Sequence, residues 1–138
     1  MIERESWKII EFVIRRHPDK KKEYEQYISE IMASSPTAAI KADESVDYSK
    51  PQSVTEAKAM KMHSKYADRL KKEIEAVELV YNNLKPEEQK LMQIRYWTDR
   101  RRNIPYLEIK GVSYSERQMR RIIYKIIKQV GKYIGEIQ

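Results

Sequence analysis

Arginine and lysine side chains recur at helical spacing near the C-terminal end of the chain. At 100° per residue, one narrow arc of this segment and its two flanks hold Arg117, Arg120, Arg121, Tyr124, Lys125 and Lys128. A guanidinium fork can bind phosphate or the O6 and N7 acceptors of guanine, and an ammonium group binds phosphate as a point charge. The pattern therefore predicts a surface that binds a nucleic acid.

The positive charge of the chain is concentrated in the same part of the sequence. The net charge is +7 over 138 residues. Residues 100–138 contain ten Lys or Arg and three acidic residues, which accounts for the whole excess, whereas residues 1–99 contain eighteen of each sign. The cations that precede the C-terminal helix are Arg100, Arg101, Arg102 and Lys110. Clustered cations bind polyanions by releasing condensed counterions, so this distribution also favours a nucleic-acid partner.

Other chemistries lack the residues that they need. The chain has no cysteine, which excludes disulfides and thiolate metal sites. Its two histidines, His17 and His63, are far apart in sequence and have no carboxylate at ligand spacing. There is no Gly-rich phosphate loop and no nucleophile with a positioned histidine, so we expect neither an enzyme nor a metal or other cofactor.

The hydrophobicity pattern predicts a cytoplasmic protein without a membrane partner. No run approaches the roughly 20 apolar residues that span a bilayer. The first residues, MIERESWKII, carry acids where a signal peptide would carry only basic residues.

The fold that positions these cations is predicted to be all-α, because apolar residues recur every three or four positions and glycine is rare. A helix over about residues 3–16 and a second one from Pro18 to about residue 33 predict an N-terminal helical hairpin, residues 1–34. Residues 35–52 combine Pro, Ser and Asp without periodicity, which indicates a linker.

A long helix is predicted from the linker to about residue 83. Ser53 and Glu56 have the spacing of a capping box at its start. Its apolar seam consists of Met60, His63, Ala67, Leu70, Ile74, Val77, Tyr81 and Leu84. Such a seam predicts either packing within the chain or a homodimer through residues 60–84.

The C-terminal part has the proportions of a helix-turn-helix. Pro86 opens one helix, a short helix is predicted over residues 105–111, and a capping box of Ser115 and Gln118 starts the last helix at Glu116. The apolar side of this last helix comprises Met119, Ile122, Ile123, Ile126, Val130 and Ile134. In a helix-turn-helix, the N-terminal residues of the second helix contact base edges in the major groove.

Two stretches, LKPEEQKLMQIRYW and YLEIKGVSYSERQMRRIIYKIIKQV, resemble the fourth conserved region of bacterial sigma factors. The resemblance covers about residues 84–134. The layout of the whole chain is similar to the ArpU/RinA-type phage transcriptional regulators. It implies a phage or prophage late-gene activator in the bacterial cytoplasm that binds double-stranded DNA, with bacterial RNA polymerase as a candidate partner.

The resemblance also assigns roles to the basic module. The positions that it places at base edges are Glu116, Arg117, Arg120 and Arg121. It also implies phosphate contacts for Ser115 and Lys125. Charge and position add further residues expected at phosphates, namely Arg100, Arg101, Arg102, Lys110, Tyr124 and Lys128. In such a site, a glutamate can accept a hydrogen bond from a cytosine amine.

Two alternatives remain open at this point. A small terminase-like packaging protein also combines a DNA-binding helical unit with oligomerising helices. A helical protein-interaction module would use the seam at residues 60–84 without binding DNA. Neither the operator sequence nor the choice between activator and repressor follows from the sequence.

Overall fold

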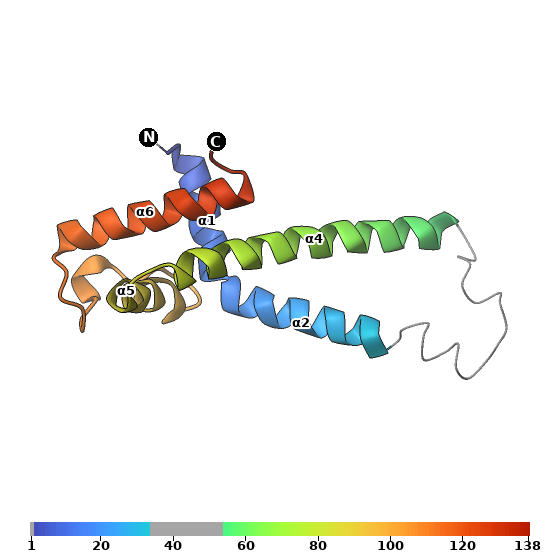
Figure 1. Cartoon of the computed structure of the whole chain (residues 1–138), viewed down its shortest axis with the longest axis horizontal. Coiled ribbons are helices and arrows are strands. Elements are labelled where there is room, and N and C mark those ends of the chain that lie inside the picture. The colour runs from blue at the N-terminus through green and yellow to red at the C-terminus, as the bar shows by residue number, and fades with distance from the viewer. Residues whose placement is uncertain (1, 34–53) are drawn as a thin grey trace. The chain divides into compact units, whose positions relative to one another are not determined.

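The computed structural model describes residues 2–33 and 54–138, with the side chains of residues 54–64 outside the description. Its elements are α1 (Arg4–Arg15), α2 (His17–Ala33), α4 (Val54–Asn82), α5 (Pro86–Trp97), the 3₁₀ turn η2 (Tyr106–Glu108) and α6 (Glu116–Ile134) (Figure 1). Every regular element in these ranges is helical, which confirms the predicted all-α class. None of these helices has the length and apolar composition needed to cross a bilayer. The predicted linker and the side chains of the Ser53–Glu56 capping box lie outside the described residues.

The chain forms two compact units that divide it differently from the predicted domains. The first unit contains Met1–Asp19 and Lys72–Gln138, and the second contains Lys20–Lys71. A hairpin of residues 1–34 would need one core shared by its two helices. Instead, α1 buries its apolar residues with α5 and α6, while α2 has no buried residue. The hydrophobic effect therefore assigns α1 to the C-terminal helices, which offer it the larger apolar surface.

The first unit has one hydrophobic core built from α1, the end of α4, α5, η2 and α6. Its fully buried side chains include Ile10, Ile14, Val77, Leu91, Met92, Tyr96, Ile123, Ile126, Ile127 and Val130. Helix α6 lies across α1 in Figure 1. Gly131 of α6 contacts Ile10 of α1 where the two helices pack. A Cβ atom added at Gly131 would lie 2.6 Å from Cδ1 of Ile10, so the glycine permits the close approach of the two helices.

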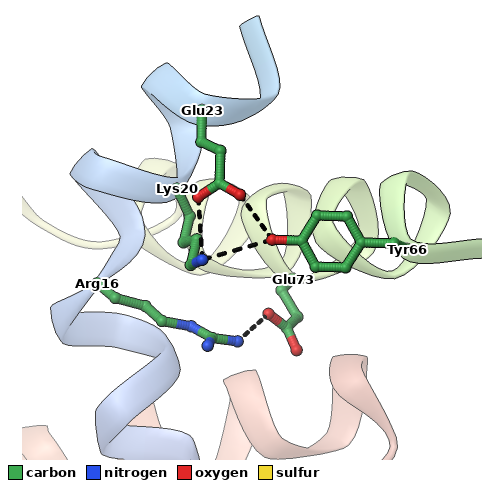
Figure 2. A network of polar contacts seen from close by, with 5 residues as sticks. All are labelled: Arg16, Lys20, Glu23, Tyr66 and Glu73. Carbon is green, nitrogen blue, oxygen red and sulfur yellow. Dashed lines mark hydrogen bonds and ion pairs between the residues drawn. The ribbon is translucent and has the colours of Figure 1, made fainter. Parts of the chain in front are cut away.

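Polar groups of α1 and α5 are satisfied at the edge of this core. The Tyr96 hydroxyl donates to Oε2 of Glu11 at 2.8 Å, and the Trp97 indole N–H donates to the Ile14 carbonyl at 2.8 Å. Burial raises the pKa of Tyr96 well above its ordinary value, and the Glu11 carboxylate raises it further. Figure 2 shows another ion pair of this unit, Arg16 with Glu73, whose Nη2 and Oε2 atoms are 2.6 Å apart.

The second unit consists of the rest of α2 and the first part of α4. Tyr66 donates its hydroxyl to Glu23 at 2.7 Å, and Lys20 forms an ion pair with the same carboxylate at 3.0 Å (Figure 2). Its buried apolar residues within the described ranges are Ala67 and Leu70. The apolar side chains at the end of α2 are exposed, Met32 to 71%.

For part of the apolar seam of α4, the structure decides between the two predictions, packing within the chain and a homodimer. Val77 and Leu84 are buried in the core of the first unit, together with Val80. These residues pack within the chain and are not available to a second copy. Met60 and His63 lie outside the residues whose side chains are described.

The short helix predicted over residues 105–111 is wrong in extent, because only the turn η2 forms. The core takes in Ile104, Tyr106 and Ile109, and an α-helix cannot present this spacing on one face. Ile109 is accordingly extended (φ −79°, ψ 121°), and Gly111 then adopts φ +90°, which ends any helix.

Candidate nucleic-acid interface

Helix α6 begins where its predicted capping box places it. The Ser115 hydroxyl accepts a hydrogen bond from the Gln118 backbone N–H at 3.2 Å, and the Gln118 side chain accepts one from the Ser115 N–H at 2.9 Å. Gly135 closes the other end in the left-handed conformation (φ 85°). Both ends of the helix are thus fixed locally, and the first turn is held in place.

The two sides of α6 differ sharply in burial. The buried side consists of Met119, Ile123, Ile126, Ile127, Val130 and Gly131. We call the exposed side the basic face, and it consists of Arg117, Arg120, Arg121, Tyr124, Lys125, Lys128 and Lys132. The predicted amphipathic pattern is confirmed for this helix. The sequence reasoning missed Lys132, although its four-residue spacing from Lys128 would have found it.

The arginines of the basic face are not equivalent. Within the described part of the chain, Arg117 and Arg121 have no ionic partner, and both are exposed. Arg120 forms an ion pair with Glu116 at 3.0 Å, and its guanidinium lies over the ring of Tyr106. The structure therefore brings two of the four predicted base-reading residues, Glu116 and Arg120, into direct contact with each other.

Tyr124 is only partly available for the phosphate contact that was predicted. Its ring centroid lies 5.9 Å from that of Trp7 on α1, and 39% of the residue is exposed. The ring thus packs against α1 on one side and presents the remainder at the basic face.

The basic loop between α5 and η2 is largely neutralised by nearby acids. Arg100 lies 3.5 Å from Asp19, and Arg102 lies 3.4 Å from Asp99 and 3.3 Å from Glu108. The guanidinium of Arg101 has no ionic partner among the described residues, and Lys110 is also exposed. Of the three predicted loop arginines, Arg101 is therefore the one most available to a phosphate.

The turn before α6 is held by a contact that no local pattern indicates. The Ser113 hydroxyl donates to Oε1 of Glu87 in α5 at 2.6 Å, and the Ser113 backbone N–H donates to the same oxygen. These hydrogen bonds lower the pKa of Glu87, and the charge of Lys90 lowers it further. The contact connects the first turn of α5 with the turn that leads into the basic face.

Taken together, these residues form an exposed cationic surface along α6. No group of three or more histidine and acidic side chains that could hold a metal gathers in residues 2–33 and 65–138. Comparison with models of protein families, with curated proteins and with solved structures finds no match to this chain. The interpretation of the surface therefore depends on its own geometry.

Proposed function

We propose that this chain binds double-stranded DNA sequence-specifically and regulates transcription, with the N-terminal half of α6 in the major groove. One observation carries the proposal. Directly after a capped N-terminus, α6 exposes a row of cations while its other side is anchored in the core. A helix held in this way can enter a groove about 12 Å wide without losing its support.

The roles within the face follow from chemistry and position. In this proposal Arg117, Arg120 and Arg121, near the start of α6, contact base edges or the nearest phosphates. Lys125, Lys128 and Lys132 lie farther along the helix, where contact with the DNA backbone fixes orientation. The sigma-like sequence features further suggest a phage or prophage activator that works with bacterial RNA polymerase in the cytoplasm.

The test is selection of bound duplexes from a random DNA pool at two salt concentrations. We expect the wild-type chain to enrich one motif at both concentrations. The double variant Arg117→Ala/Arg120→Ala should lose the motif and keep only weak binding that salt abolishes. A matched control, Arg69→Ala/Lys72→Ala, removes the same charge from exposed positions of α4 and should enrich the wild-type motif.

Each outcome bears on the proposal. If all three proteins bind every sequence alike, with affinity set by salt alone, the surface attracts DNA but does not read it. If the double variant and the control enrich the same motif as wild type, the basic face is not the reading surface. Solution mass separates the terminase-like alternative, which requires a large ring.

A further inference from the structure

Arg120 differs from the other cations of the basic face because two groups fix its direction. Its Nη2 atom lies 3.0 Å from Oε1 of Glu116, one helical turn earlier. Its Cζ atom lies 4.7 Å from the centroid of the Tyr106 ring. Its side chain is nevertheless 63% exposed, so part of the guanidinium fork stays open to a ligand.

The ring that supports Arg120 is itself fixed to the core of the first unit. Tyr106 is 9% exposed, and Cζ of Arg95 lies 4.1 Å from the same ring centroid. Arg95 donates to the Ile104 carbonyl at 2.9 Å and lies 3.6 Å from the Glu11 carboxylate. A continuous set of contacts thus leads from α1 through α5 and η2 to Arg120.

This arrangement suits a base edge better than a phosphate. The Glu116 carboxylate beside the guanidinium repels a phosphate and neutralises much of the attraction that Arg120 offers it. A G·C base pair presents both complementary groups in the major groove, namely the guanine O6 and N7 acceptors and the cytosine N4 donor. An arginine already held in place also loses less side-chain entropy on binding than a free one.

We propose that Arg120 and Glu116 together read one G·C base pair, with Tyr106 as the residue that positions Arg120. Arg120 donates to guanine O6 and N7, and Glu116 accepts from the cytosine N4 amine. Arg117 and Arg121, which have no such support, contact phosphates. This inference rests on the proposed DNA-binding function. It gives Arg120 a different role from Arg117 and Arg121, although the sequence pattern predicts base contacts for all three.

The experiment uses the full chain and the duplex enriched from the random pool, with each guanine replaced in turn by 7-deazaguanine. This base keeps its pairing and lacks only the N7 acceptor. We expect one position at which wild type loses affinity, by less than the roughly 5- to 150-fold worth of a complete bidentate contact because guanine O6 is kept. Arg120→Ala should bind the normal and substituted duplexes equally. Tyr106→Leu, which keeps an apolar side chain at this site, should show a smaller difference between the duplexes than wild type.

Salt dependence gives a second readout that a purely structural role would not produce. Arg120→Ala should keep the wild-type salt slope, whereas Arg121→Ala should flatten it by about 0.9. If Arg120→Ala retains the sensitivity to 7-deazaguanine and Arg117→Ala or Arg121→Ala loses it, the inference is overturned while DNA binding stands. If no motif is enriched at all, the proposed function fails first.

Discussion

Helices α6 and α2 have similar lengths, but apolar residues extend along most of α6 and only along the second half of α2, and the two helices differ in burial. Of the 19 residues of α6, six are buried, whereas none of the 17 residues of α2 is. Helix α6 lies among α1, α5 and η2, which cover its apolar side. Within the second unit, the described partner of α2 is the first part of α4, and two helices alone cannot enclose a core. Apolar spacing therefore predicts that a helix forms, but its burial depends on how far the apolar side extends and on how many neighbours cover it.

The polar contacts of the two units differ in the same way. The hydroxyl–carboxylate contact of the first unit, Tyr96 with Glu11, involves a fully buried ring. The corresponding contact of the second unit, Tyr66 with Glu23, involves a ring that is 46% exposed. Water competes more strongly for the second contact than for the first, so we expect the first unit to be the more stable.

The largest difference should come from the same truncation in the two helices. Ile126→Ala removes a side chain that is 0% exposed and should cost about 2–5 kcal/mol through lost burial and a cavity. Ile31→Ala removes the same atoms from a residue that is 46% exposed and should cost about 0.5 kcal/mol or less. Denaturant unfolding of both variants measures the difference. Equal losses would show that α2 is covered as fully as α6.

A smaller effect is expected where α1 and α6 cross. Gly131→Leu forces a side chain into the space held by Ile10 and Ile137 and should cost about 1–3 kcal/mol by overpacking. Lys132→Leu, at the adjacent exposed position, is the matched control and should stay within about 0.5 kcal/mol of wild type. Thermal unfolding followed by tryptophan fluorescence reports both. A harmless Gly131→Leu would mean that the two helices are not in close contact.

Removing one tyrosine hydroxyl from each unit tests the same difference in stability between the two units. Tyr96→Phe deprives the Glu11 carboxylate of its buried donor and should cost about 1–2 kcal/mol. Tyr66→Phe removes an exposed contact and should cost under about 0.5 kcal/mol. Urea unfolding curves of the two variants are sufficient for this test. The reverse order would contradict the assignment of the more stable unit.

The smallest effects are expected from two exposed polar contacts, one a hydrogen-bonded carboxylate and one an ion pair, whose contributions should be lost at opposite ends of the pH range. The lowered pKa of Glu87 means that its contact with Ser113 contributes stability above the ordinary carboxyl value of 4.5. That contribution is lost as the pH falls through the lowered pKa. The raised pKa of Lys20, due mainly to its hydrogen bond with Glu23, contributes stability below 10.5 that is lost as the pH rises through the raised value.

The measurement is the pH dependence of unfolding for wild type, Ser113→Ala and Glu23→Gln. The difference in stability between wild type and Ser113→Ala should shrink as the solution becomes acidic, and the difference between wild type and Glu23→Gln should shrink as it becomes strongly alkaline. Ser113→Ala and wild type would follow the same curve if Glu87 titrated normally in the folded state.

Local features of the fold were predictable, because the interactions that set them lie within a few residues. The start of α6 at Glu116 follows from Ser115 and Gln118, and its buried side follows from the spacing of Ile123, Ile126 and Val130. Pro86 marks the first residue of α5 in the same way. Capping and amphipathicity involve neighbours in sequence, so a single chain displays them directly.

Contacts between distant residues were not predictable from these patterns. No spacing rule connects Ile10 with Gly131, Glu87 with Ser113, or Tyr106 with Arg120, since each pair meets only after the chain has packed. For the same reason the predicted N-terminal hairpin missed the place of α1 in the core. The candidate site shows the same division, because its exposed cations could be read from the sequence but the restraint on Arg120 could not.

The close crossing at Gly131 matters for anyone who wishes to shorten this protein. A C-terminal fragment of residues 53–138 would keep every cation of α6. It would lack Ile10, Val13 and Ile14 of α1, which share a hydrophobic core with α6. Its isoleucines would then be exposed to water, and the fragment should aggregate or unfold although every residue of the basic face is intact. The first fifteen residues contribute no side chain to the basic face, yet their packing is needed to keep the C-terminal helix folded.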